Sequence, residues 1–161
     1  MGDDHVETLR RFYEANRNEL FTYALAVSRS REAAEDAIHT AFSRMLKRRR
    51  PPRELRPYVF RCVRNAAIDE HRARSREAQE DSPFAIDETH NNGHDPELQR
   101  QLADMLLTLS EDERESIMLK IYSGMTFNEI AATRAVSVNT AASWYRRGIE
   151  KLRALMQGDM E

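Results

Sequence analysis

Two capping boxes constrain the fold of this 161-residue chain more than any other sequence feature. Ser110-Glu-Asp-Glu113 and Thr126-Phe-Asn-Glu129 each place a hydroxyl and a carboxylate where both can bond free N–H groups at a helix start. The first box predicts a helix through about Ser123, which Gly124 closes. The second box predicts a helix of about two turns that ends near Arg134.

A tight turn and a longer helix follow the second box. Ala135-Val136 is the predicted turn, and Ser137 is placed to cap a final helix that Val138 and Ala141 anchor. This order of elements is the helix-turn-helix layout, whose second helix enters the major groove of DNA. The alternative is a plain helical hairpin with a coincidentally polar face. Because polar side chains and free N–H groups suit phosphates and base edges, the candidate DNA-binding residues are Thr126, Ser137, Asn139, Thr140, Ser143, Trp144, Arg146 and Arg147.

The N-terminal part of the chain also carries apolar residues at helical spacing. Residues 5–28 predict two short helices, with a break or cap at Asn16 or Asn18. Ser30 is placed to cap the next helix, which is expected to run to about Lys47.

A proline pair separates these helices from a further one. Pro51-Pro52 cannot continue a helix, because proline lacks the N–H and blocks the preceding turn. The next helix is predicted from about Leu55 to Ser75, and Pro57 is tolerable in its first turn. Its expected apolar face consists of Tyr58, Val59, Cys62, Val63, Ala66 and Ile68.

Composition and punctuation together indicate an all-α protein of two small helical domains. The chain has only 5 Gly and 5 Pro, against many Ala, Leu, Arg and Glu. Residues 76–96 are polar, acidic and turn-rich, which is typical of a flexible linker. The expected organisation is a domain of residues 1–75, this acidic linker, and a domain of residues 97–161.

Charge is strongly segregated along the chain, although the net charge is only −2. Twelve basic and three acidic residues lie between Arg44 and Arg76, whereas seven acids and no Lys or Arg lie between Glu77 and Glu97. A basic stretch followed by an acidic linker is compatible with a nucleic-acid partner. Charge runs are also common on ordinary solvated faces, so this pattern does not decide the function by itself.

Several classes of protein fit the sequence poorly. No apolar run approaches the roughly 18 residues of a membrane span, so we expect a cytoplasmic protein with no membrane contact. Cys62 cannot form an internal disulfide, and its apolar setting favours a buried structural thiol over a redox sensor. His90 and His94 lie in the linker without matching cysteines, and no nucleophile lies beside a base. We therefore expect a protein without enzymatic activity, metal or cofactor.

Four stretches of the chain resemble, in order, the conserved regions of sigma-70 family RNA polymerase sigma factors. Residues 34–42 resemble region 2.2, residues 58–72 resemble regions 2.3 and 2.4, residues 109–115 resemble region 4.1, and residues 124–152 resemble region 4.2. The chain has no room for regions 1.1 and 3. The resemblance is therefore to the compact extracytoplasmic-function (ECF) group.

The resemblance implies partners and residue roles. The expected partners are core RNA polymerase, through its β′ clamp helices and β flap, promoter DNA, and an anti-sigma factor; the free protein is expected to be a monomer. The polymerase-binding residues would be Asp36, His39 and Phe42, with Asp36 pairing an arginine. The promoter −10 element would be held by Arg61, Arg64, Asn65, Asp69 and Arg72, and the C-terminal helix would read the −35 element. Alternatives remain for Asp36 as a plain surface acid, and for Asn65 and Asp69 as internal hydrogen-bonding groups.

The chain also departs from the family pattern. Asn139, Ala141, Ala142 and Trp144 stand where Gly, Val, Lys and Arg are usual, and Trp144 could contact a thymine methyl or sugar, or a neighbouring helix. His39-Thr40 replaces a Gln-Glu pair, and Tyr58 replaces tryptophan. The usual turn glycine is Ala135, so we expect this residue to avoid a positive φ.

A second functional interpretation comes from the helix-turn-helix alone. A DNA-binding regulator that never engages polymerase could use the N-terminal domain for dimerisation. Such a regulator would protect palindromic DNA by itself, whereas a sigma factor would need core polymerase for promoter-specific initiation.

Overall fold

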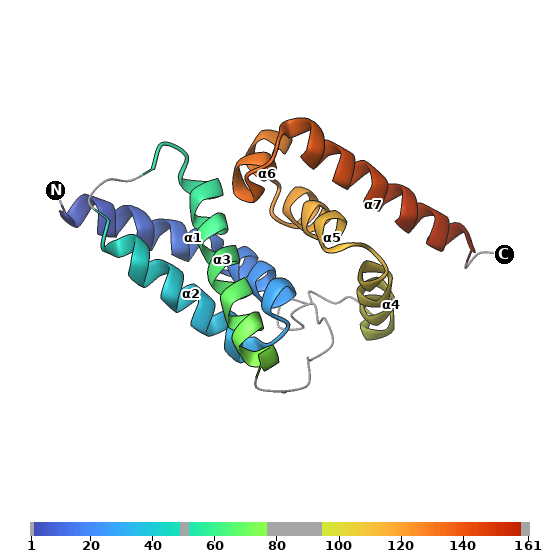
Figure 1. The fold of residues 1–161 in the computed structure, drawn as a ribbon, viewed down its shortest axis with the longest axis horizontal. Helices are drawn as coiled ribbons and strands as arrows, with labels where there is room; N and C mark the ends of the chain where they lie inside the picture. The colour runs from blue at the N-terminus through green and yellow to red at the C-terminus, as the bar shows by residue number, and fades with distance from the viewer. Residues whose placement is uncertain (1, 49–51, 77–94, 159–161) are drawn as a thin grey trace. The chain divides into compact units, whose positions relative to one another are not determined.

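The computed structural model describes residues 2–48, 52–76 and 95–158, and every regular element within them is a helix (Figure 1). The chain divides into two compact units, residues 1–85 and 86–161. The all-α prediction is confirmed. The expected linker of residues 76–96 lies, apart from its two ends, outside the described residues.

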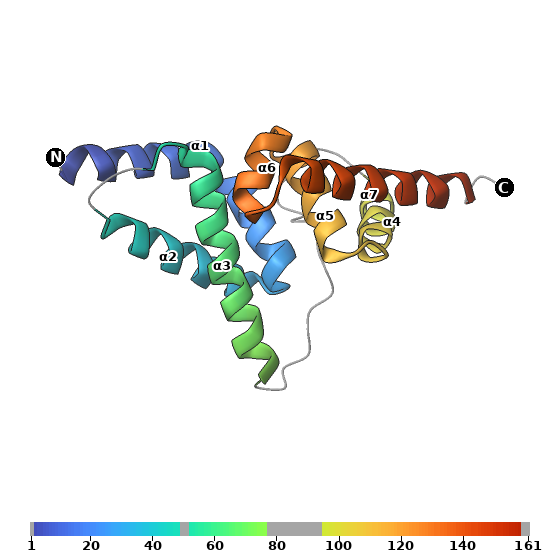
Figure 2. The same cartoon turned by 45° about the horizontal axis from the view of Figure 1, so that its top comes forward.

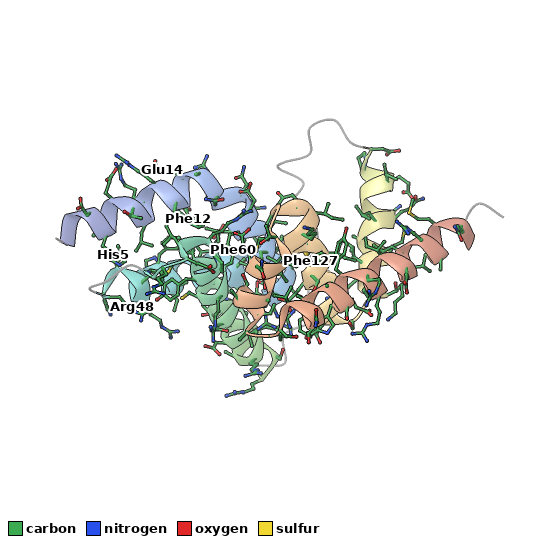
Figure 3. All side chains as sticks on the ribbon, turned by 90° about the horizontal axis from the view of Figure 1, so that it is seen from above. His5, Phe12, Glu14, Arg48, Phe60 and Phe127 are labelled. Atoms are coloured by element: carbon green, nitrogen blue, oxygen red, sulfur yellow. The ribbon has the colours of Figure 1, made fainter. Side chains whose placement is uncertain are left out.

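The N-terminal unit consists of three helices packed against one another: α1 (Gly2–Ser28), α2 (Arg31–Leu46) and α3 (Leu55–Arg76). The chain reverses between α1 and α2, and α3 crosses this pair, as Figure 2 shows. Phe60 of α3 is fully buried and its ring contacts Phe12 and Tyr23 of α1, with ring centroids 6.5 and 5.9 Å apart. Figure 3 shows Phe12 and Phe60 between the helices. These aromatic contacts fix α3 on α1.

Helix α1 is continuous, so the predicted break at Asn16 or Asn18 is wrong. Asn16 does not cap a new helix; its side-chain amide donates to the carbonyl of Phe12 one turn earlier, at 3.0 Å. Asparagine costs a helix only about 0.7 kcal/mol relative to alanine. Burial of Leu9 on one side of this segment and Leu20 on the other outweighs that cost, because both pack into the same core.

The turn into α2 matches the sequence prediction. Ser30 is the N-cap, and its hydroxyl accepts a hydrogen bond from the Ala33 N–H at 3.3 Å. Before it, Arg29 adopts a left-handed conformation with φ 61°, and its N–H donates to the Leu25 carbonyl at 2.7 Å. Helix α1 therefore ends at Ser28, and only Arg29 and Ser30 separate it from the start of α2.

Histidines satisfy carbonyls at the ends of two helices. His5 Nε2 lies 2.9 Å from the carbonyl of Met45 near the end of α2, and His71 Nδ1 lies 3.3 Å from the carbonyl of Ser28 at the end of α1. His5 is buried, so its bond helps to join the start of α1 to the end of α2. Both histidines thus link one helix of this unit to another.

Helix α3 has the predicted start, with Pro57 buried in its first turn. Its buried face is rotated from the expected one. Tyr58, Cys62 and Ile68 lie only half-buried at its edges, whereas Phe60 and Ala67 are fully buried but were not expected there. The buried residues of α3 are Pro57, Val59, Phe60, Val63, Ala66 and Ala67.

The described part of the C-terminal unit consists of α-helices and one π-helical turn. Its elements are α4 (Pro96–Leu107), α5 (Glu111–Ile117), a π-helical turn η2 (Met118–Tyr122), α6 (Phe127–Arg134) and α7 (Val138–Gly158). Asp95 caps α4 by accepting from the Glu97 N–H at 3.0 Å. Both capping boxes are closed in each direction, by Ser110 with Glu113 and by Thr126 with Glu129. The helix starts were thus correctly predicted.

A buried arginine ties α4 to α5. Arg114 donates from Nε to the carbonyl of Leu106 and from Nη2 to the carbonyl of Leu109, both at 3.1 Å. Carbonyls at a helix C-terminus have no partner within the helix, so this guanidinium satisfies the end of α4 while it is itself removed from water. The α4–α5 corner is therefore fixed by one side chain.

The helix after the first capping box was predicted as plain α-helix to about Ser123, and this is only partly correct. From Met118 to Tyr122 the chain widens into a π-turn, in which the Ser123 N–H bonds the Met118 carbonyl at 3.1 Å. Met118 is buried there, whereas Ile121 is 63% exposed. Gly124, with φ 65°, then ends the element as predicted.

The turn between α6 and α7 corrects another prediction. Ala135 has φ 55° and ψ 48°, so the expectation that it avoids a positive φ is wrong. The left-handed residue lets the Val136 N–H bond the Ala131 carbonyl at 3.0 Å and closes α6 before Ser137 starts the next helix. This tight closure outweighs a left-handed strain of about 1–2 kcal/mol in alanine.

We expect Ala135→Gly to stabilise the C-terminal unit. The substitution removes the left-handed strain but adds unfolded-state entropy, so the net gain is about 0.5–1 kcal/mol in the free energy of unfolding. Urea unfolding followed by the fluorescence of Trp144, the single tryptophan, measures it. The matched control is Ala132→Gly, at an exposed position inside α6, which should lose about 1 kcal/mol. Equal destabilisation by both variants would contradict the prediction.

Candidate nucleic-acid interface

The C-terminal unit contains the predicted helix-turn-helix, formed by α6, the turn and α7. Ile130 and Ala131 of α6 are buried, as is Ala141 of α7, so these residues hold the two helices together as expected. Val136 lies in the predicted turn and is half-buried. Val138 is 41% exposed and does not anchor α7, because the buried stripe of that helix begins one turn later.

Helix α7 lies unusually close to α5 at Gly148. A Cβ atom at this buried glycine would lie 2.6 Å from Ile117 Cδ1 and 3.4 Å from Glu113 Cβ. The absence of a side chain therefore lets the two helices approach each other. One turn further along α7, Lys151 Nζ reaches Glu113 Oε1 at 2.8 Å.

Glu113 thus joins the start of α5 to the middle of α7. Burial raises the pKa of Glu113, but hydrogen bonds with Lys151 and Ser110 lower it by more, so that it lies below the ordinary 4.5. The carboxylate is consequently charged at neutral pH. In this state it holds both the capping box and the orientation of α7.

The Glu113 carboxylate should make the C-terminal unit sensitive to acid. Because the folded pKa is lowered, its contribution is complete above pH 4.5 and is lost as the pH falls through the lowered value. Glu113→Gln should cost about 1 kcal/mol at neutral pH and flatten the acid dependence of unfolding followed by Trp144 fluorescence. Glu111→Gln, at an exposed position in the same turn, is the control and should keep the acid dependence. An unchanged acid dependence in Glu113→Gln would refute this role.

Arg134 at the end of α6 connects the three helices around the turn. Its side chain is 7% exposed; it pairs with Asp112, and its Nη1 lies 3.4 Å from Glu115 Oε2, both on α5. Its Cζ also lies over the Trp144 ring of α7, 4.8 Å from the centroid. The sequence left two contacts open for Trp144, one with DNA and one with a neighbouring helix. The structure shows the second, because one face of the ring lies against Arg134 of α6.

The other candidate residues of the helix-turn-helix fall into two groups. Thr126 and Ser137 are exposed, but their hydroxyls act as helix caps; Ser137 Oγ accepts from the Thr140 N–H at 3.1 Å. Thr140 and Ser143 are half-buried and belong with Thr126 and Ser137 to the first group. The second group presents its side chains to solvent from α7. This group consists of Asn139, Arg146 and Arg147.

An aromatic and cationic cluster beside α6 was not found from the sequence. Lys120 Nζ of η2 lies 4.5 Å from the ring centroid of Phe127, and this ring makes an edge contact with Tyr145 of α7 at 5.5 Å. Figure 3 shows Phe127 on α6. The π-turn places Lys120 here, so periodicity read as α-helix could not have located it.

In the N-terminal unit, the candidate −10 residues form a stripe along α3. Arg61, Asn65, Asp69 and Arg72 follow one another at intervals of three or four residues and are all exposed. Arg64 lies beside this stripe, is half-buried and makes contacts within the protein. The structure therefore brings four of the five predicted residues onto one solvent-facing surface.

Cys62 lies at the edge of this surface. It is half-buried rather than fully buried. Burial raises the pKa of the thiol, and a hydrogen bond with Tyr58 and the nearby Arg48 guanidinium lower it by less. Arg48 also donates to the Tyr58 hydroxyl and lies over its ring, with Cζ 5.1 Å from the centroid. The thiol is thus protonated at neutral pH, which agrees with a structural role.

The candidate polymerase-binding residues lie on α2. Asp36 and His39 are exposed, and Phe42 is half-buried with its ring 5.3 Å from that of Tyr13. Asp36 has an ion-pair partner within the protein, since its Oδ2 lies 3.2 Å from Nη2 of Arg74 on α3. The exposed face of α2 is therefore acidic and polar, and the guanidinium of Arg74 lies beside it.

Within residues 2–48, 52–76 and 95–158, no group of three or more His, Cys, Asp or Glu is placed to hold a metal ion. His90 and His94 lie outside these ranges. None of the described helices is long and apolar enough to cross a membrane.

A short capped helix, a left-handed turn and a long arginine-bearing helix define a DNA-binding protein of the helix-turn-helix class. Residues 12–77 match the family model for sigma-70 region 2, and residues 99–152 match that for sigma-70 region 4. The chain is 32% identical to the RNA polymerase sigma factor CarQ of Myxococcus xanthus, over 80% of this chain and 76% of CarQ. It is 27% identical to the ECF sigma factor EcfG of Rhodopseudomonas palustris (strain TIE-1), over 87% and 80%.

Solved structures show the same fold. The sigma factor RpoE of Bartonella quintana, in complex with the anti-sigma factor NepR, matches with a TM-score of 0.75 and 23% identity over 94% of this chain and 98% of RpoE. CnrH, in complex with the cytosolic domain of CnrY, matches with a TM-score of 0.70 and 21% identity over 98% and 93%.

The chain belongs to the sigma-70 family of RNA polymerase sigma factors, in its ECF group. It binds core RNA polymerase and promoter DNA and directs transcription initiation. Sigma factors are initiation factors rather than enzymes.

Proposed function

We propose that the two units divide promoter recognition between them. Residues 1–75 bind the polymerase clamp and the −10 element, residues 76–96 connect the units, and residues 97–161 read the −35 element. The observation that carries this division is the presence of one exposed polar surface on α3 and another on α7. Each surface lies on a helix whose opposite side is buried.

The α7 surface fits duplex DNA. Asn139, Arg146 and Arg147 can reach base edges and phosphates, while the start of α7 presents N–H groups to the phosphate backbone of DNA. Lys120, held on Phe127, adds a cation beside the same helix pair. Thr126, Ser137, Thr140 and Ser143 position these groups and contribute through their hydroxyls. Trp144 acts mainly from within, as the surface on which Arg134 rests.

The α3 surface fits an opened strand. Arg61, Arg64 and Arg72 neutralise phosphates, and Asn65 and Asp69 supply donors and acceptors for an extruded base. This combination suits the −10 element, where strand opening begins.

The α2 face fits a cationic polymerase surface. Asp36 supplies the charge, His39 a polar neighbour, and Phe42 an apolar edge beside Tyr13. We assign this face to the β′ clamp helices and the C-terminal unit to the β flap. The protein acts in the cytoplasm, because polymerase and promoter are there, and it does so as a monomer without catalytic activity of its own.

An inhibitory protein partner is part of the proposal. RpoE of Bartonella quintana is solved with an anti-sigma factor, and this chain has the same fold. A partner that covers the α2 face or the α7 surface would block polymerase or DNA directly.

Run-off transcription with purified core polymerase and a promoter library selects a target promoter, and equilibrium binding of the polymerase complex to that promoter at several salt concentrations tests the assigned surface. Arg147→Ala should lower promoter affinity and reduce the slope of log K against log salt by about 1, because one phosphate contact is lost. The control is Arg153→Ala, an exposed arginine further along α7, which should leave both quantities unchanged. Equal effects of the two substitutions would count against the assigned surface. Binding of the chain alone to palindromic DNA would instead favour a polymerase-independent regulator.

A further inference from the structure

Arg74 of α3 contacts three acids: Asp36 of the α2 face, its neighbour Glu32 on α2, and Glu70 on α3. The acidic α2 face proposed to bind polymerase is called the polymerase face below. Arg74 lies with Nη2 3.2 Å from Asp36 Oδ2, Nη1 3.5 Å from Glu32 Oε2 and Nε 3.7 Å from Glu70 Oε2. Its side chain is only 24% exposed, whereas that of Asp36 is 57% exposed. The arginine is therefore enclosed, and the carboxylate that it touches stays open to a second partner.

The position of Arg74 on α3 separates it from the DNA-facing stripe. It follows Arg72 by two residues, which is about 200° around a helix. It belongs instead to the side of α3 that buries Val63 and Ala67. Arg74 therefore faces α2, and its charge acts on the acids of the polymerase face.

The charges of this cluster do not balance. Three carboxylates surround one guanidinium, so the cluster keeps an excess of negative charge that attracts a cation. The same guanidinium repels any second cation that approaches Asp36. Removing it would deepen the negative potential where an incoming arginine or lysine must bind.

We propose that Arg74 is an internal competitor for Asp36, which weakens the affinity of the free protein for core polymerase. The proposal rests on the proposed contact between Asp36 and a cationic side chain of polymerase. In the free protein Arg74 occupies one edge of the carboxylate. On binding, the polymerase cation takes up the exposed edge and Arg74 turns toward Glu32 and Glu70, which remain within its reach.

Equilibrium binding of the full chain to core polymerase, without DNA, tests this competition. Arg74→Gln should tighten binding by about two- to fivefold, the range of an exposed ion pair, and the gain should shrink at high salt. Arg74→Lys keeps the charge and should bind like the wild type. Arg10→Gln, which removes an arginine paired with Glu7 and Glu14 on its own helix, is the control for net charge and should change nothing.

A double substitution separates competition from a purely structural role. In an Asp36→Asn background, Arg74→Gln should have no effect on polymerase affinity, although it still lowers the thermal stability of the chain. Arg74→Met, which keeps an apolar stem against α2, replaces the Gln variant if circular dichroism shows that variant to be unfolded.

The outcomes distinguish a failure of the competition by Arg74 from a failure of the proposed contact between Asp36 and polymerase. Tighter polymerase binding together with lower thermal stability of Arg74→Gln supports competition. If Arg74 had only a structural role, its loss would lower both the polymerase affinity and the thermal stability. If Asp36→Asn weakens binding but the neutral Arg74 variants do not strengthen it, the competition is overturned and the Asp36 contact stands. If Asp36→Asn leaves binding unchanged, both fail.

Discussion

The orientation of α7, the second helix of the helix-turn-helix, depends on one buried carboxylate, that of Glu113. It closes the capping box of α5 through the Ser110 N–H and binds Lys151 of α7 at 2.8 Å. Gly148 allows the two helices to approach at the adjacent turn. At the other end of the motif, Arg134 adds a second connection from α6 to α5 and to Trp144. The exposed arginines of α7 are placed by these contacts rather than by the turn alone.

The helix starts could be predicted because the interactions that make them are local. Asp95, Ser110, Thr126 and Ser137 each bond an N–H within three residues, and such spacing is readable in any sequence. The errors arose where tertiary packing decides. The sequence predicts a break or cap at Asn16 or Asn18, yet burial on both sides of this segment keeps α1 continuous.

Two backbone conformations, at Ala135 and in the π-turn, do not follow from residue preference. Ala135 accepts a left-handed conformation because α6 must end before Ser137, and no propensity scale contains that requirement. The π-turn at Met118–Tyr122 is likewise invisible to a periodicity of 3.6, since the sequence there reads as ordinary amphipathic helix. Its consequence is that Lys120 lies beside Phe127.

The candidate surfaces were predicted in outline, and their internal partners were not. The exposed stripe of α3 and the polar side of α7 follow from helical spacing. Long-range pairs such as Asp36 with Arg74, or Trp144 with Arg134, join helices that the sequence cannot place against each other. The most direct test of the central claim is a footprint of a target promoter made with the chain alone, core polymerase alone, and both together. Protection of the −10 and −35 elements is expected only in the mixture; the same protection by the chain alone would contradict recognition of the promoter as part of polymerase.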